Sequence, residues 1–192
     1  MRVIAGRLGG RRLAAPAGRA TRPTSDRVRE ALFSVLGSVE GLAVLDLFAG
    51  SGALGIEALS RGAERAVFVE RSAPAVAALR ANLDALGLGP EVAVVRRLGA
   101  VGALRSALGR RETYDLVFLD PPYRQAARLA PELSDALPGV LAPGARVIAE
   151  SDRRAPLRLA LELRDERRYG DTVISIHQAR PPTPAPDNDP RT

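Results

Sequence analysis

Apolar and polar residues alternate along the chain in blocks that predict strands and helices in turn. From residue 42 onward, short runs of apolar residues alternate with longer stretches in which apolar residues recur every three or four positions. The expected strands are 42–47, 65–70, 91–95, 115–120 and 145–150, and the expected helices are 53–60, 73–86, 101–108 and a segment within 126–137. Such alternation predicts βαβ units and a parallel, doubly wound α/β sheet.

The C-terminal part departs from this alternation. Segments 161–168 and 171–177 both have strand character and flank Tyr169 and Gly170, a turn-forming pair, so they predict an antiparallel hairpin with no helix between its strands. The expected fold is therefore a Rossmann-like α/β domain whose seven-stranded, mostly parallel sheet ends in this hairpin. Residues 180–192 hold five prolines and few apolar groups, which predicts a disordered tail.

The N-terminal part carries shorter signals. Segments 2–5 and 11–14 are candidate strands joined across glycines and predict a small β-hairpin. Apolar residues then recur at helical spacing after Thr24 and Ser25, either of which can cap a helix. The expected organisation is a basic N-terminal β-hairpin extension at 1–20, a Rossmann-like α/β domain at 21–179 and a proline-rich tail at 180–192.

Composition excludes several classes of site. The chain has 192 residues, of which 46% are hydrophobic, enough for one domain with a sizeable core. It has no cysteine and a single histidine, His177, so we expect no disulfide and no metal centre, and we assign His177 no function. The absence of lysine excludes a Walker A or Schiff-base lysine. With no long apolar run and no signal-like N-terminus, the expectation is a cytoplasmic monomer without a membrane segment.

The positive charge is concentrated at the N-terminus. Residues 1–30 hold eight arginines and two acidic residues, a net charge of +6 that equals the net charge of the whole chain. A basic extension on a neutral body indicates a polyanionic partner. Arginine also suits bidentate contacts with phosphate, although a bias in genomic base composition is the stronger explanation for arginine in place of lysine.

A glycine-rich loop follows the first expected strand and predicts a cofactor site. Residues 50–55, Gly-Ser-Gly-Ala-Leu-Gly, match the dinucleotide pattern, and Glu70 lies at the end of the next strand. Taken alone, the loop fits NAD and S-adenosylmethionine about equally. Asp46 before the loop favours S-adenosylmethionine, because a carboxylate suits a sulfonium and an ammonium group better than a pyrophosphate. Glu70 is then expected to accept the ribose hydroxyls.

Asp-Pro-Pro-Tyr at residues 120–123 ends the fourth expected strand and predicts the catalytic loop. The exocyclic amino group of a nucleobase is a poor nucleophile because its lone pair is delocalised into the ring. The Asp120 carboxylate and the Pro121 carbonyl can accept its two N–H bonds and favour a pyramidal nitrogen, and the prolines bring no competing N–H. Tyr123 can stack on the base. The predicted reaction is methylation of a nucleobase amino group.

Two other interpretations remain open at the level of these residues. An adenine- or cytosine-amino DNA methyltransferase uses a similar tetrapeptide, although such enzymes usually need a target-recognition domain for which this chain has little room. A non-catalytic RNA-binding or assembly protein with a relic pocket is disfavoured by the intact acids and glycines. Binding of S-adenosylmethionine separates the second interpretation from an enzyme.

Four blocks of sequence closely resemble the RsmD family. They are Thr-Arg-Pro-Thr-Ser-Asp-Arg-Val-Arg-Glu-Ala-Leu-Phe at 21–33, the stretch 45–63 around the glycine loop, Val-Phe-Val-Glu at 67–70 and the tetrapeptide at 120–123. The resemblance covers about residues 1–178 and implies a class I S-adenosylmethionine-dependent methyltransferase. It further implies transfer of a methyl group to N2 of one guanine in bacterial 16S rRNA, with 16S rRNA, the 30S subunit or an assembly intermediate as the partner.

The same resemblance implies the roles of individual residues. The expected cofactor site comprises Asp46, Phe48, Ala49, Gly50, Ser51, Gly52, Glu70, Arg71, Gly99 and Ala100. The expected catalytic loop comprises Asp120, Pro121, Pro122 and Tyr123. The expected RNA-facing residues are Arg2, Arg7, Arg11, Arg12, Arg22, Thr24, Arg27 and Arg29. Many relatives place an Asp or Asn after the third strand to bind adenine, whereas this chain has none there, so recognition is expected from backbone groups at Gly99 and Ala100.

Overall fold

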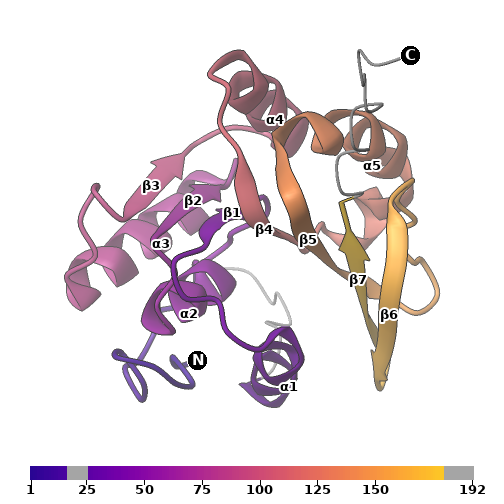
Figure 1. The fold of residues 1–192 in the computed structure, drawn as a ribbon. Coiled ribbons are helices and arrows are strands. Elements are labelled where there is room, and N and C mark those ends of the chain that lie inside the picture. Colours follow the sequence, from indigo (N-terminus) through magenta and orange to yellow (C-terminus); the bar gives the residue numbers. More distant parts are fainter. Residues whose placement is uncertain (17–25, 180–192) are drawn as a thin grey trace, which may run out of the picture.

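One mixed sheet forms the centre of the molecule in the computed structural model, which describes residues 1–16 and 26–179 (Figure 1). Within these residues the sheet has seven strands in the order β3-β2-β1-β4-β5-β7-β6. The strands are β1 (Ala43–Asp46), β2 (Arg65–Val69), β3 (Ala93–Arg96), β4 (Tyr114–Leu119), β5 (Leu141–Asp152), β6 (Glu162–Tyr169) and β7 (Thr172–Gln178). The helices are α1 (Asp26–Leu36), α2 (Ala53–Ser60), α3 (Ala73–Leu86), α4 (Ala100–Gly109), α5 (Tyr123–Ala136) and the short 3-10 helix η1 (Leu137–Val140).

Strand directions confirm the predicted topology. β1 to β5 pair in parallel, whereas β7 pairs antiparallel with both β5 and β6. Reversal of strand order on either side of β1 brings the carboxyl ends of β1 and β4 together, and open α/β sheets bind ligands at such a point. The fold class expected from the sequence is therefore confirmed.

The central strands are apolar on both faces because helices cover both sides of the sheet. Leu116 and Phe118 of β4 pack in the core beneath α1, α2 and α3, while Val117 and Leu119 pack in the core beneath α4 and α5. Figure 1 shows these two helical layers. This burial on both faces explains the continuous apolar runs that predicted parallel strands.

Two elements differ most from their predicted bounds. β5 begins at Leu141 rather than 145, because Leu141 already pairs with Tyr114 and an irregularity in the register lets the strand continue past Pro143 and Gly144. α5 begins at Tyr123, directly after Pro122 at the N-cap position. The prolines and the glycine at these positions predicted loops, whereas the structure has a continuing strand and the start of a helix there.

The predicted N-terminal hairpin is present as a paired loop rather than as two regular strands. Arg2 and Arg12 form an isolated antiparallel bridge, and Val3 donates its N–H to the Arg11 carbonyl at 2.9 Å. Leu13 and Gly10 also donate their N–H groups to the carbonyls of Met1 at 3.0 Å and Val3 at 2.9 Å, whereas Ile4 and Ala5 donate to a side chain of α2. The prediction was right in the pairing and wrong in the regularity of the strands.

Buried polar side chains fasten the N-terminal segment to the domain. The Glu57 carboxylate accepts the N–H groups of Ile4 at 2.7 Å and Ala5 at 3.0 Å, although Glu57 has no exposed surface. Asn82 of α3 exchanges two hydrogen bonds with the Ala14 backbone, and its amide also donates to the Ser51 carbonyl at 2.9 Å. The segment is therefore tied to the glycine loop as well as to the helices.

Replacing Glu57 by glutamine is expected to loosen this segment without unfolding the domain. A glutamine oxygen can accept one of the two N–H groups, while its amide faces the other, and an unsatisfied buried donor costs about 1–3 kcal/mol. Hydrogen exchange at Ile4 and Ala5 should accelerate by about tenfold or more. Glu30→Gln on the exposed side of α1 is the matched control, and equal exchange in both variants would contradict the role of Glu57.

Several expectations concern parts of the chain that the structure does not describe. The predicted tail at 180–192 and the segment 17–25, which contains Arg22 and Thr24, lie outside the described residues. Within the described ranges no helix is long and apolar enough to cross a membrane. The described ranges also contain no group of three or more acidic, histidine or cysteine side chains that could hold a metal ion.

Candidate active site

A cavity of about 730 Å³ opens at the carboxyl edge of the sheet, where the ends of β1, β2 and β4 meet. Its size lies within the range of about 300–1,000 Å³ that small-molecule sites occupy. Three acidic residues from three different strand ends line it: Asp46, Glu70 and Asp120. The cavity therefore joins the two sequence features that predicted a cofactor site and a catalytic loop.

Asp46 ends β1 and is almost fully buried at the base of this cavity. Its carboxylate accepts the N–H of Gly55 at 3.2 Å. Burial raises the pKa of Asp46 to about 7, and the hydrogen bond from Gly55 only partly opposes that effect. Because burial of a carboxylate is costly without a counter-charge, this position favours a cationic ligand.

The glycine loop combines an open position with a packed one. Gly50 has φ +55, and a Cβ added there would meet no atom within 4 Å, so its backbone faces open space on the cavity side. Gly52 has φ +87, and a Cβ there would lie 2.4 Å from Cδ1 of Leu79. Gly52 is not among the residues that line the cavity. It is required for close packing at the start of α2.

Glu70 follows β2 and fixes the loop from the opposite side. Its two carboxylate oxygens accept the N–H groups of Gly50 at 3.1 Å and Ser72 at 2.7 Å. A carboxylate has about four acceptor positions, so these bonds leave capacity for a ligand hydroxyl. Glu70 thus shapes the cavity and can still accept hydrogen bonds within it.

Nine of the ten expected cofactor residues line the cavity. They are Asp46, Phe48, Ala49, Gly50, Ser51, Glu70, Arg71, Gly99 and Ala100. Gly99 is the N-cap residue of α4, so the first backbone N–H groups of that helix are available on this side. Leu98 and Leu129 add apolar surface nearby, which suits a flat aromatic ring.

The predicted catalytic loop forms the opposite wall. Asp120 is half-buried, Pro121 is buried and Pro122 is exposed, and all three line the cavity. The pKa of Asp120 is raised well above its usual range by burial first, then by the negative charges of Glu150 and Asp46. The side chain of Tyr123 lies outside the described residues. The acceptor pair expected from the sequence therefore faces the same space as Asp46.

The arginines expected to face RNA fall into two groups. The side chains of Arg2, Arg7, Arg11, Arg12 and Arg27 are exposed. Arg29 is completely buried, and its guanidinium donates to Asp26 at 2.9 Å and to the Arg2 carbonyl. The expectation that Arg29 contacts RNA is therefore wrong, because its guanidinium is buried and hydrogen-bonded to groups inside the protein.

Sequence reasoning missed several residues around the site. Glu57, Asn82 and Glu150 are buried polar groups, and Met1 and Pro16 bring the N-terminal segment to the cavity wall. A signal existed for two of them: Glu57 and Asn82 occupy positions within the apolar stripes of α2 and α3. A polar residue in such a stripe is unusual enough to indicate a specific partner.

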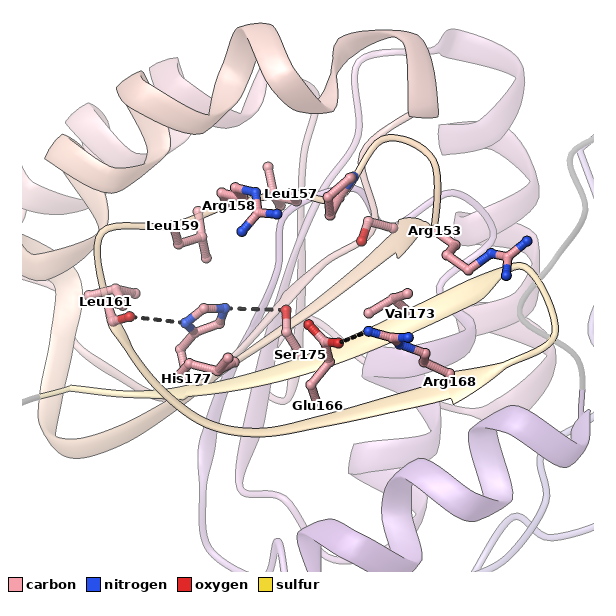
Figure 2. A pocket seen from close by; sticks show the side chains of 13 residues that line it. Arg153, Leu157, Arg158, Leu159, Leu161, Glu166, Arg168, Val173, Ser175 and His177 are labelled. Atoms are coloured by element: carbon pink, nitrogen blue, oxygen red, sulfur yellow. Dashed lines mark hydrogen bonds and ion pairs between the residues drawn. The ribbon is translucent and has the colours of Figure 1, made fainter.

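A second, smaller cavity of about 250 Å³ lies between β6, β7 and the segment before β6 (Figure 2). Figure 2 shows His177 between Leu161 and Ser175: its Nδ1 lies 3.2 Å from the Leu161 carbonyl and its Nε2 lies 3.2 Å from the Ser175 hydroxyl. Burial lowers the pKa of His177. Both ring nitrogens therefore have partners, and a packed neutral histidine accounts for this position.

Comparison with a family model matches residues 1–178 to the family described as Conserved hypothetical protein 95. A putative rRNA methyltransferase, YlbH, from Bacillus subtilis is 40% identical over 94% of this chain and 100% of its own length. The ribosomal RNA small subunit methyltransferase D of Haemophilus influenzae is 36% identical over 82% of this chain and 81% of its own length.

Solved structures agree with this assignment. The putative methyltransferase yhhF from Escherichia coli is 34% identical, with a TM-score of 0.78 over 94% of this chain and 98% of its own. A hypothetical protein from Thermus thermophilus, TTHA0928, is 33% identical, with a TM-score of 0.80 over 93% and 99%. The sequence blocks, the sheet with its antiparallel end and the family match lead to one conclusion: this chain belongs to the Conserved hypothetical protein 95 family, also known as the RsmD family.

Proposed function

We propose that this chain is an S-adenosylmethionine-dependent methyltransferase that methylates the exocyclic N2 of a guanine in bacterial 16S rRNA. One observation carries the proposal. A single cavity holds a buried acid suited to a cation at the end of β1 and a pair of hydrogen-bond acceptors at the end of β4. A methyl donor and an amino group can therefore meet inside it.

The residues at the β1 and β2 ends fit S-adenosylmethionine. When bound, this cofactor supplies an electrophilic methyl group on a positively charged sulfur. Asp46 offers a buried carboxylate to positive charge, and Glu70 offers acceptors to ribose hydroxyls. The open backbone at Gly50 permits close approach, and the helix start at Gly99 offers N–H groups to a ring nitrogen. Each of these protein groups would contact a different part of S-adenosylmethionine.

The β4 end fits an amino nucleophile. Asp120 and the Pro121 carbonyl are expected to accept the two amino hydrogens, so the nitrogen lone pair turns toward the cavity. Asp120 must be ionised for this task, although burial and its acidic neighbours raise its pKa in the protein alone. Positive charge in the cavity favours the ionised form, so occupancy by the cofactor prepares the acceptor.

The choice of RNA is supported by relatives and by charge, whereas the choice of guanine rests on the sequence blocks that resemble the RsmD family. Two similar proteins carry names that specify rRNA or the small ribosomal subunit. The exposed N-terminal arginines form a basic surface beside the cavity wall that Met1 and Pro16 supply. A cytoplasmic location follows from this substrate. The alternative, an amino-methyltransferase acting on DNA or another RNA, shares the acceptor loop.

Mapping methylated nucleotides tests the proposal. Small ribosomal subunits from cells lacking the protein should carry one unmethylated guanine, and the purified protein should restore its N2-methylation with labelled S-adenosylmethionine. Duplex DNA and free adenine-containing RNA are the comparison substrates. Labelling of duplex DNA without labelling of the subunits or their precursors would replace this proposal with the alternative.

Replacing Arg11 and Arg12 by alanine is expected to weaken RNA binding and to flatten its salt dependence. Each lost phosphate contact lowers the log–log slope by about 0.9 for duplex and about 0.7 for single-stranded RNA. Binding should be measured across a salt series. Arg105→Ala with Arg110→Ala, in and just after α4, removes two exposed arginines elsewhere and is the matched control. An unaltered slope would assign the N-terminal arginines to a solvated surface.

A further inference from the structure

Glu150 lies beside Asp120 on the neighbouring strand. β4 and β5 pair in parallel with Leu119 opposite Ala149, so the residues that follow them, Asp120 and Glu150, are also neighbours on adjacent strands. Leu119 and Ala149 both face the core beneath α4 and α5. Because side chains alternate along a strand, Asp120 and Glu150 both face the other side. Two carboxyl groups are therefore placed side by side.

Glu150 is buried between a second acid and a buried arginine. Its side chain is only 5% exposed, and its charge is one of the causes that raise the pKa of Asp120. On its other side lies α1, where burial lowers the pKa of Arg29 and the charges of Asp26, Glu57 and Glu150 oppose that effect. Arg29 thus supplies the counter-charge that a buried carboxylate needs next to a second acid. A carboxylate at this position offers hydrogen-bond acceptors beside Asp120.

β5 lies on the side of β4 that is away from β1 and from the described cavity lining. The described lining comes from the ends of β1, β2 and β4, the loop after β3, the first turns of α2, α3 and α4, α5 and the N-terminal segment, and includes no residue of β5. A base whose amino group is held by Asp120 and faces the cavity must extend its ring away from the cavity. In the sheet order β1-β4-β5, that direction lies over β5, in which Glu150 stands two residues before the strand ends at Asp152.

Nucleobases differ in the atom next to the amino group. Guanine presents an N1–H donor beside its 2-amino group, whereas adenine and cytosine present a ring lone pair beside theirs. A carboxylate attracts the donor and repels the lone pair, and extruded bases are read at this edge. We propose that Glu150 accepts the N1–H of the target guanine and thereby selects guanine over adenine and cytosine. This rests on the proposed function and names the group that reads the base.

The test uses 2-aminopurine, which keeps the 2-amino group but has a lone pair at N1. Small subunits are reconstituted with guanine or 2-aminopurine at the mapped position, and kcat/KM is measured for each. The wild-type protein should prefer guanine by about 10–100-fold. Glu150→Gln can donate an amide hydrogen to the N1 lone pair, so its preference should fall by about tenfold. Loss of O6 affects both proteins, so the change in preference between them is the diagnostic quantity.

Controls separate this inference from the proposed function. Asp165→Asn makes the same charge change on the exposed edge strand β6 and should leave the preference unchanged. If Glu150→Gln does not fold, Glu150→Asp keeps the counter-charge for Arg29 and should lower guanine methylation by about tenfold with cofactor affinity within about twofold. Methylation of neither substrate by the wild type would refute the proposed function. Normal guanine methylation with the same preference in both proteins would refute the role of Glu150 alone.

Discussion

Replacing Asp120 by alanine is expected to reduce turnover by about 100–1,000-fold while cofactor binding survives. The carboxylate lies on the β4 wall, and the residues expected to bind the cofactor come from other strand ends. Alanine removes the acceptor that aligns one amino hydrogen but leaves the Pro121 carbonyl in place. Single-turnover rates measured with saturating cofactor report the chemical step, and calorimetry reports the affinity for S-adenosylmethionine.

Two controls make this result specific to Asp120. Asp135→Ala removes an exposed acid from α5 and should leave both measurements unchanged. Asp120→Asn keeps an acceptor oxygen of similar geometry, so its defect should be smaller than that of alanine. Unchanged turnover in Asp120→Ala would remove the acceptor role and, with it, the proposed mechanism.

Cofactor affinity is expected to rise steeply with pH up to about 7 and then level off. The pKa of Asp46 is raised by burial to about 7, and only the ionised form attracts a cation. Below pH 7, affinity should therefore fall by about tenfold for each pH unit. Binding should also release a proton, which calorimetry detects as a heat that varies with the ionisation enthalpy of the buffer. Titrations at about pH 5.5, 6.5 and 7.5 suffice.

Titration of Asp46 is expected to have the opposite effect on the stability of the ligand-free protein, which should fall as the pH rises. The folded pKa of Asp46 exceeds its ordinary value of 3.8, so the folded protein holds this proton between about pH 4 and 7. Ligand-free stability should fall as pH rises through that window, and stabilisation by the cofactor should grow. Asp46→Asn should weaken binding and flatten both profiles, and a steep profile in that variant would assign the proton to another acid such as Asp120.

The fold was predictable because hydrophobic pattern and turn chemistry agree along most of the chain. α2 and α3 begin and end where the periodicity predicted, since glycine or serine precedes each and a glycine follows α3. The errors arose where tertiary pairing overrides local signals. β5 runs through Pro143 and Gly144 because β4 offers a partner before them. Such pairing has no counterpart in local composition.

The candidate site was predictable where backbone chemistry dictates the residue type. The glycines of the loop and the prolines after β4 have few purely structural explanations at these positions. They therefore predicted a binding site where the structure has the cavity. Charged side chains were harder to interpret, because charge alone does not show whether a side chain is exposed to solvent or buried in the interior. Arg29 and Arg27 have the same type and lie two residues apart, yet Arg29 is buried and Arg27 is exposed. Only packing of α1 on the sheet distinguishes them.

The amide of Asn82 has a thermodynamic consequence. One side chain holds both the Ala14 backbone, next to the basic segment, and the Ser51 carbonyl of the glycine loop. Order gained in either segment therefore lowers the entropic cost of ordering the other. Thermodynamic linkage requires this effect to be reciprocal. A ligand bound at the glycine loop raises the affinity for a polyanion by the same factor by which the polyanion raises the affinity for that ligand.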